Sequence, residues 1–262
     1  VGILDSYFPG ANFFTEFERF DRYCEKLRRS GQAIDYVSVC SPNYLHDAHV
    51  RFGMRIGADV ICEKPVVLNP WNVDALAEME KETGKKVYSI LQLRLHPAII
   101  ALREKILTGG DGKKYAVGLK YITARGNWYQ SSWKGDIDKS GGIATNIGIH
   151  FFDILLWIFG EVKKNIVGRH DSKTASGKLE FSNAEVNWLL SIDAEQLPPE
   201  AKSNGHSSYR SLVIDGEEVK FNDGFNELHT GSYREILSGK GVRLPETRKV
   251  IQLLHDIRSN SS

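Results

Sequence analysis

The stretch Ala58-Asp59-Val60-Ile61-Cys62-Glu63-Lys64-Pro65 predicts a short buried strand that ends in a charged turn. Its run of apolar residues is typical of a strand in a parallel sheet that is covered on both faces. The carboxyl end of such a strand is where open α/β sheets bind their ligands. A lysine there can hydrogen-bond a substrate hydroxyl and help to remove its proton. An isolated lysine at a strand end is more often a solvated charge, so the neighbouring segments decide its role.

Those segments alternate between strand and helix patterns. We predict strands over residues 12–14, 34–40, 58–62 and 87–92, and helices over residues 15–29, 45–56 and 70–83. Thr15 and Glu18 form a capping-box pattern at the start of the first helix. This β-α-β-α-β alternation predicts a Rossmann-type, doubly wound parallel sheet.

The pattern changes after residue 93. A helix over 98–107 and a long strand over 114–125 lead into an aromatic loop over 127–134 and an apolar helix that starts at Gly141-Gly142. Strands over 164–170, 177–181, 185–192, 209–214 and 218–221 follow, and helices over 230–238 and 244–258 close the sequence. Asp215-Gly216 is a strong hairpin signal. We therefore predict two domains, an incomplete dinucleotide-binding domain over 1–93 and an α+β domain with a mostly antiparallel open sheet over 94–262.

The composition excludes several classes of function. A net charge of +1 over 262 residues gives no electrostatic footprint for nucleic acid. No apolar run is long enough for a membrane span, and the most apolar stretch is 151–159. The three cysteines lack metal spacing, as do the remaining histidines, so we expect no metal site and free thiols in a reducing cytoplasm.

Three segments together carry more information than any one of them. Ser41-Pro42-Asn43-Tyr44-Leu45-His46, Glu63-Lys64-Pro65 and the stretch from Gly141 to Asp153 resemble, in order and spacing, the Gfo/Idh/MocA family of nicotinamide-dependent sugar oxidoreductases. That family opens with a strand, a Gly-rich phosphate loop and a helix. No G-x-G-x-x-G pattern opens this sequence, so we expect the first βαβ unit to be absent from it.

The resemblance implies two catalytic residues, Lys64 and His150. In one assignment, a neutral imidazole accepts the hydroxyl proton and the lysine positions the oxygen and stabilises its charge. The reverse assignment is open, because a desolvated lysine can act as a base. Asn146 stands where the family usually has Asp, so a proton relay that needs a carboxylate at that position is in doubt. In this family the peptide before Pro65 is often cis.

The resemblance also implies the residues that bind ligands. The cofactor NAD is expected along Ser41, Pro42, Asn43, His46, Glu63, Lys64, Gln92 and Trp133. The substrate is expected at Lys64, Arg125, Asn127, Tyr129, Lys134, Asn146, His150 and His229. Arginine and lysine in the 125–134 loop suit an acidic substrate such as a uronate or a diphosphate. The alternative interpretations are helix capping for Ser41 and Asn43, and structural packing for the aromatic loop.

Within the family, the segments at 7–17, 41–47, 91–97 and 125–129 resemble the bacterial WlbA/WbpB branch. That branch implies NAD-dependent oxidation at C3 of UDP-N-acetylglucosaminuronate, in O-antigen lipopolysaccharide synthesis, by a cytoplasmic homotetramer. Two alternatives stay open: another sugar or inositol dehydrogenase of the family, and a non-catalytic sugar- or nucleotide-binding regulatory protein. The residue that would discriminate NAD from NADP is expected upstream of this sequence.

Overall fold

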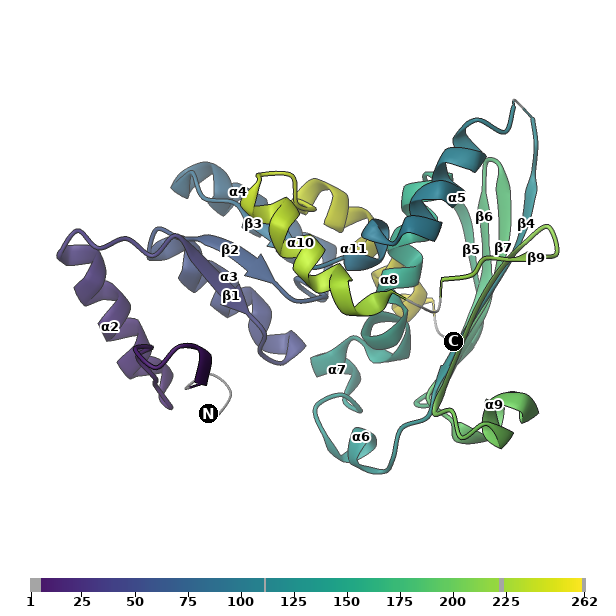
Figure 1. Cartoon of the computed structure of the whole chain (residues 1–262), viewed down its shortest axis with the longest axis horizontal. Helices are drawn as coiled ribbons and strands as arrows, with labels where there is room; N and C mark the ends of the chain where they lie inside the picture. Colours follow the sequence, from purple (N-terminus) through teal and green to yellow (C-terminus); the bar gives the residue numbers. More distant parts are fainter. Residues whose placement is uncertain (1–5, 111, 222–223, 261–262) are drawn as a thin grey trace.

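Two sheets carry the fold in the computed structural model, which describes residues 6–110, 112–221 and 224–260 (Figure 1). The first sheet has the order β1 (Tyr36–Val39), β2 (Asp59–Cys62), β3 (Val87–Ser89), with every pair parallel. Helices α2 (Phe17–Arg29), α3 (His46–Arg55) and α4 (Pro70–Thr83) alternate with these strands, and a short 3₁₀ turn, η1 (Asn43–Leu45), precedes α3. The predicted Rossmann-type parallel sheet is confirmed.

Close packing of α3 on this sheet explains a glycine in the middle of the helix. A Cβ atom at Gly53 would lie 2.6 Å from the Cγ2 atom of Val60 and 3.3 Å from the Cβ atom of Val37. Real Cβ atoms do not approach other atoms so closely, so a larger residue would push the helix away from the sheet. The close approach keeps β2 covered: Val60, Ile61 and Cys62 are at most 3% exposed.

Two expectations near the start of the chain were wrong. Residues 12–14 are not a strand, because two apolar residues in a row do not fix a strand that pairs with nothing in the described chain. Helix α2 begins at Phe17 with Glu16 as its N-cap, and no side chain caps it. The capping-box pattern at Thr15 therefore lies one residue too early.

The second sheet has the order β5-β6-β7-β4-β8-β9. Its strands are β4 (Tyr115–Thr123), β5 (Val162–His170), β6 (Thr174–Phe181), β7 (Ala184–Ser191), β8 (Ser208–Ile214) and β9 (Glu217–Glu218). All neighbours are antiparallel except β4 and β7, which are parallel. The predicted hairpin lies between β8 and β9, where Asp215 and Gly216 have φ values of 51° and 86°. These left-handed values are those of the predicted turn type.

Helices lie on one face of this sheet, between it and the first sheet (Figure 1). They are α5 (Pro97–Leu107), α8 (Gly142–Phe159) and α11 (Leu244–Ser259), whereas α10 (Leu228–Leu237) packs through Ile236 on Ile61 and Tyr88 of the first sheet. Helix α8 packs on β6 and β7, and α11 packs on α8, α4 and β5, so both sheets share one continuous core. The remaining short elements are η2 (Gln92–Leu95), α6 (Trp128–Ser131), α7 (Ile137–Ser140), η3 (Ala194–Gln196), α9 (Pro199–Ser203) and η4 (Phe225–Glu227). The predicted domain division falls within η2 and stays a prediction.

Helix α8 is the central element of the molecule. A Cβ atom at Gly148 would lie 2.5 Å from Leu190 Cδ1 and 2.8 Å from Phe152 Cε2, so this glycine lets the helix lie directly on β7. By length and composition, Ile137–Phe159 passes the test for a membrane-spanning helix, which the sequence analysis did not expect. Its most apolar window is 72% buried inside the protein. Burial in the core therefore accounts for the apolar character of this segment.

Candidate functional site

The carboxyl ends of the three parallel strands meet at one edge of the first sheet. Val39 lies opposite Cys62, and Cys62 lies opposite Ser89. The residues that follow these strands include Ser41, Lys64 and Gln92. The register therefore brings predicted cofactor and catalytic residues from three distant segments to the edge where open α/β sheets bind ligands.

Lys64 points from this edge towards α8. The peptide bond between Lys64 and Pro65 is cis, and the Nζ atom donates a hydrogen bond of 2.7 Å to the backbone oxygen of Asn146. Burial lowers the pKa of Lys64 to about 8, with Glu63 opposing this and the charges of Lys134 and Arg125 reinforcing it. At neutral pH about a tenth of the lysine is then an unprotonated amine.

His150 lies one turn after Asn146 on α8. Its Nδ1 atom is buried and has no hydrogen-bond partner in the described part of the chain. Burial, followed by the positive charges of Lys64, His229 and Arg210, holds the pKa of His150 well below its usual value of 6.5. The imidazole is therefore neutral at pH 7 and has both a donor and an acceptor for a ligand.

Lys64 and His150 line one cavity of about 210 Å³. A water molecule occupies roughly 30 Å³ of liquid, so this space suits one small group, such as a sugar ring, rather than a whole nucleotide. The residues that line it are Lys64, Gln92, Leu93, Tyr121, Arg125, Asn146, Ile147, His150, Phe151, Arg210 and Phe225. Of these described residues, three are cations and none is acidic, so they favour an anionic ligand.

Asn146 connects the lysine to the aromatic loop. Its backbone oxygen accepts the hydrogen bond from Lys64, and its Nδ2 atom donates to the hydroxyl of Tyr129 over 2.6 Å. Tyr129 is 2% exposed and does not line the cavity. Its hydroxyl orients the Asn146 amide, which leaves the Oδ1 atom of Asn146 for a ligand.

The other loop residues lie around the cavity rather than in it. The Nζ atom of Lys134 lies 5.3 Å from the ring centroid of Trp128 and 5.7 Å from that of Trp133. Asn127 is exposed at the start of α6. Arg125 is the loop residue that does line the cavity. The rings of Trp128 and Trp133 thus hold the charge of Lys134 near Lys64. The aromatic residues of this loop therefore serve packing and also position a cation that can bind a ligand.

Hydrogen bonds hold the loop after β1 in place. The ring nitrogens of His46 lie 2.6 Å from the Pro65 oxygen and 2.7 Å from the Ser41 oxygen. Asn43 donates to the Ser140 oxygen over 3.0 Å, and the Ser41 hydroxyl lies 2.8 Å from His49 Nδ1. Helix capping, the alternative interpretation, is not observed, because the N-cap residues of η1 and α3 are Pro42 and Leu45, and neither makes a side-chain cap. Asn43 and His46 are buried and fix the backbone of this loop.

Helix α10 closes over the strand edge. The Nε2 atom of His229 lies 3.1 Å from Gln92 Nε2, and its Nδ1 atom lies 3.8 Å from Glu63 Oε1. The Oε1 atom of Gln92 is buried and has no partner in the described chain. The hydroxyl of Tyr233 lies 2.7 Å from the Ser38 hydroxyl. Predicted cofactor and substrate residues therefore meet here, although His229 does not line the cavity.

Sequence reasoning missed two groups of residues. Arg210 and its neighbours Tyr121 and Phe225 line the cavity, but no local motif marks them. Arg94 makes a two-bond ion pair with the buried carboxylate of Asp153, at 2.6 and 2.8 Å. This pair ties η2, which carries Gln92, to the helix that carries His150. Asp153 lay within a quoted motif, but nothing in the sequence indicated its partner.

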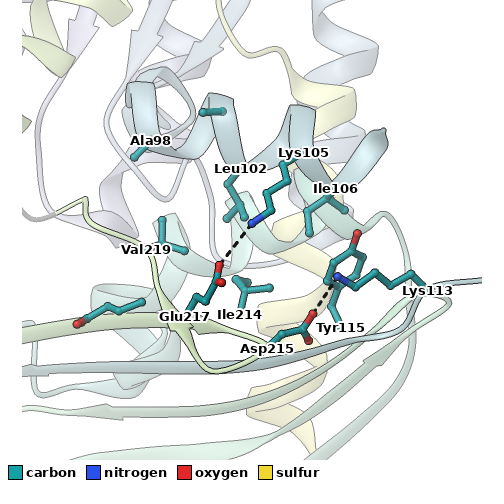
Figure 2. A pocket seen from close by; sticks show the side chains of 12 residues that line it. Ala98, Leu102, Lys105, Ile106, Lys113, Tyr115, Ile214, Asp215, Glu217 and Val219 are labelled. Carbon is teal, nitrogen blue, oxygen red and sulfur yellow. Dashed lines mark hydrogen bonds and ion pairs between the residues drawn. The ribbon is translucent and has the colours of Figure 1, made fainter. Parts of the chain in front are cut away.

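A second cavity, of about 350 Å³, lies between α5 and the β8–β9 hairpin (Figure 2). Its cations are already paired, since Lys105 lies 3.5 Å from Glu217 and Lys113 lies 3.2 Å from Asp215. None of the predicted site residues lines it. Among the described residues, no group of His, Cys, Asp and Glu is arranged to hold a metal ion. The cavity at Lys64 and His150 is therefore the candidate active site.

Comparison with known proteins supports this assignment. Residues 1–90 match the family model described as an oxidoreductase family, NAD-binding Rossmann fold, and residues 103–196 match that family's C-terminal alpha/beta domain. D-glucoside 3-dehydrogenase of Escherichia coli (strain K12) is 26% identical over 178 residues, which is 59% of this chain and 51% of the relative. The chain spans about half the length of the curated relatives it matches.

Two solved structures are much more similar. The WlbA (WbpB) dehydrogenase from Thermus thermophilus in complex with NAD and alpha-ketoglutarate has a TM-score of 0.95 and 46% identity, covering 99% of this chain and 84% of that one. The same dehydrogenase in complex with NAD and UDP-GlcNAcA has a TM-score of 0.93 and 46% identity, covering 98% and 83%. With its two family-model matches and this coverage, the chain belongs to the Gfo/Idh/MocA family of oxidoreductases.

Proposed function

We propose that this protein oxidises the C3 hydroxyl of UDP-N-acetylglucosaminuronate to the 3-keto sugar, with NAD as the hydride acceptor. The observation that carries the proposal is the cavity in which Lys64 and a neutral His150 face the same space. Oxidation of a secondary alcohol needs a group that takes the hydroxyl proton and a donor that stabilises the developing carbonyl oxygen. The similar Thermus thermophilus dehydrogenase was solved with NAD and with UDP-GlcNAcA.

The carboxyl ends of the strands of the first sheet carry groups that suit a nicotinamide. The buried Oε1 atom of Gln92, which has no partner in the described chain, is an acceptor of the kind that a carboxamide requires. The residues that would hold NAD are Ser41, Pro42, Asn43, His46, Glu63, Lys64, Gln92 and Trp133. Asn43 and His46 act through the loop backbone that they fix. When bound, NAD supplies the acceptor for the hydride of C3.

We assign Lys64 as the base. A general base works best when its pKa is near the working pH, and the pKa of Lys64 is about 8. The pKa of His150 is held well below 6.5, so its imidazole accepts a proton only weakly. The unprotonated Nζ atom takes the proton of the C3 hydroxyl while the C–H bond breaks. His150 remains neutral and donates a hydrogen bond to the oxygen as it becomes a carbonyl.

The charge of the cavity supports an anionic sugar. Lys64, Arg125 and Arg210 line the cavity, and none of the described residues that line it is acidic; Lys134 lies close enough to lower the pKa of Lys64. A uronate carboxylate and a diphosphate are both matched by such cations. A neutral polyol such as inositol would leave these charges unpaired, which weakens the case for another sugar or inositol dehydrogenase.

A turnover assay tests the proposal. The purified protein is mixed with NAD and either UDP-N-acetylglucosaminuronate, UDP-N-acetylglucosamine or myo-inositol, and reduced nicotinamide is followed by its absorbance. Each reaction is run with and without alpha-ketoglutarate, because a similar dehydrogenase was solved with this compound. We expect the uronate to be the preferred substrate, with slower turnover when the C3 hydrogen is replaced by deuterium. Absence of an isotope effect at C3, or a preference for inositol, would contradict the proposal.

Two substitutions separate an enzyme from a non-catalytic binding protein. Lys64→Ala removes the base, so turnover should fall by about 10²-fold or more, and His150→Ala should reduce it less. Turnover of Lys64→Ala within a few fold of the wild type would make the catalytic assignment wrong. Binding of UDP-sugar without any turnover in the wild type would favour the regulatory-protein alternative.

The proposal extends to the setting of the enzyme. We propose a cytoplasmic homotetramer that acts in O-antigen lipopolysaccharide synthesis and binds neither nucleic acid nor membrane. The net charge of +1 and the burial of the apolar helix support the last two statements. Native mass spectrometry of the purified protein tests the assembly, and a dimer or monomer as the main species would contradict it.

A further inference from the structure

Arg210 is the cavity residue whose position is most constrained by aromatic rings. It lies on β8, directly opposite Tyr121 on β4. Its guanidinium carbon lies 5.3 Å from the ring centroid of Tyr121 and 4.6 Å from that of Phe225. Stacking on ring faces restricts a guanidinium while leaving the N–H groups at its edge free to donate in the plane. Arg210 is therefore held ready for a planar acceptor.

The charge of Arg210 is not neutralised within the described part of the chain. No ion pair or hydrogen bond joins its side chain to a described Asp or Glu residue. By contrast, the arginines at 94, 243 and 248 each contact a carboxylate at 2.6–2.9 Å. Glu200 and Glu218 line a neighbouring pocket with Arg210, but neither forms an ion pair with it, so an acceptor that enters the cavity could pair with this guanidinium.

The cations in and around the cavity influence different catalytic residues. Arg125 and Lys134 influence the pKa of Lys64, whereas Arg210 influences that of His150. Arg125 is exposed, whereas Arg210 is half-buried against two rings. A sugar nucleotide acid carries two kinds of negative charge, a carboxylate on the ring and a diphosphate outside it. The half-buried arginine suits the group fixed to the ring, and the exposed loop suits the group that extends outwards.

We propose that Arg210 recognises the ring carboxylate of the uronate through a two-bond guanidinium–carboxylate contact, and thereby sets the preference for a uronate over the corresponding hydroxymethyl sugar. This inference rests on the proposed function, because it concerns the substrate of the same cavity. Arg210 is a specificity residue in this assignment, and the proton and hydride transfers do not depend on it. Planar carboxylate recognition is the task for which arginine is better suited than lysine.

The experiment compares two substrates that differ only at C6. UDP-N-acetylglucosaminuronate and UDP-N-acetylglucosamine are assayed for kcat/KM with NAD, and their binding is measured by titration calorimetry in the presence of NADH, which cannot accept the hydride. The variants are Arg210→Gln, which removes the charge, and Arg210→Lys, which keeps the charge but loses the planar fork. Arg103→Gln is the matched control, since Arg103 also stacks on an aromatic ring, at 4.4 Å from the Trp157 centroid, but lies outside the cavity.

We expect Arg210→Gln to lower kcat/KM for the uronate by about 10- to 100-fold, as expected for loss of a charge-assisted hydrogen bond. The rate with the hydroxymethyl sugar should change by less than about threefold. Arg210→Lys should recover part of the preference, and Arg103→Gln should leave the ratio of the two rates at the wild-type value. An unchanged ratio in a folded Arg210→Gln variant, or equal losses with both sugars, would overturn the inference.

The binding measurements separate this inference from the proposed function. If the wild type oxidises neither sugar but binds the uronate more tightly, and Arg210→Gln removes that difference, the proposed function fails and the carboxylate assignment stands. If the wild type oxidises the uronate and Arg210→Gln leaves the binding difference intact, the carboxylate assignment fails and the proposed function stands. Thermal unfolding of each variant identifies a general loss of structure.

Discussion

The protonation state of Lys64 should control the pH dependence of catalysis. Its pKa of about 8 means that the unprotonated fraction rises from about 9% at pH 7 to about 91% at pH 9. If the amine is the base, kcat/KM for the uronate rises about tenfold between these two values and then levels off. Below about pH 7 the slope of log kcat/KM against pH should approach one.

The magnitude follows from the surroundings of the amine. Burial is the main cause of the lowered pKa, Glu63 opposes it, and Lys134 and Arg125 add to it. Lowering the pKa from 10.5 to about 8 corresponds to about 3 kcal/mol against the ammonium form.

The assay measures kcat/KM from about pH 6 to about pH 10 at constant ionic strength, using absorbance of the reduced cofactor. kcat/KM reports the pKa values of the free enzyme. His150→Asn is the matched variant: it removes the imidazole but leaves Lys64 in its buried position, so the rising limb should remain. A chemical probe of Lys64, such as pH-dependent acylation followed by peptide mass spectrometry, gives the same pKa without turnover.

A kcat/KM that falls as the pH rises would refute the assignment of Lys64 as the base. If kcat/KM falls as the pH rises through about 8, the reaction requires the ammonium form and His150 takes the proton. If kcat/KM were still rising with a slope near one at about pH 10, Lys64 would titrate near its ordinary value of 10.5, and burial would not control this amine in solution. Either result would leave the fold assignment intact but reverse the roles of the two residues.

Three further outcomes are expected. Lys134→Met should move the rising limb to higher pH, because the charge of Lys134 lowers the pKa of Lys64; an unmoved limb in the same pH profile would contradict this. Between about pH 7.5 and about pH 5, the free energy of unfolding of the wild type should fall by up to about 2 kcal/mol more than that of His150→Asn. Urea unfolding at these two pH values measures the difference. Stability falls because the imidazole of the unfolded chain takes up a proton below pH 6.5, whereas the native ring stays neutral. Asp153→Asn should cost about 3 kcal/mol in urea unfolding, since Arg94 loses its buried carboxylate, and the pair Arg94→Met with Asp153→Leu should cost less than the two single changes added together.

Features set by neighbouring residues could be predicted from the sequence. The buried strand before Lys64, the helix α4 and the turn at Asp215 are local patterns of burial, helix propensity and turn chemistry, and each is present where it was predicted. Element ends were less accurate. The last predicted strand, over 218–221, is only Glu217–Glu218, because turn chemistry fixes where a hairpin starts but not how far its second strand pairs.

Features that depend on distant pairings could not be predicted. Arg210 reaches the cavity because β8 pairs with β4 in a register that sets it opposite Tyr121, and no single segment encodes that register. The parallel pairing of β4 with β7 is likewise a property of the whole sheet. The contact between Arg94 and Asp153 joins residues 59 positions apart. Motif resemblance located Lys64 and His150, whereas the charges that tune them come from elements that carry no motif.

The clustering of cations leads to a last expectation about the enzyme–substrate complex. Without substrate, the charges of Lys134 and Arg125 disfavour the ammonium form of Lys64, and among the described residues no acidic side chain lines the cavity. A bound carboxylate supplies the missing negative charge, which favours the ammonium form of Lys64 and raises its pKa. The rising limb of kcat, which reports the bound enzyme, should therefore lie at higher pH with UDP-N-acetylglucosaminuronate than with UDP-N-acetylglucosamine.

The charge of NAD does not affect this difference between the two kcat profiles, because NAD is the same in both enzyme–substrate complexes. Binding of the uronate would make the amine a stronger base, but it would also leave a smaller fraction of the amine unprotonated at pH 7. Superimposable kcat profiles for the two sugars would show that the carboxylate lies too far from Lys64 to act on it. The cation cluster would then contribute to binding alone.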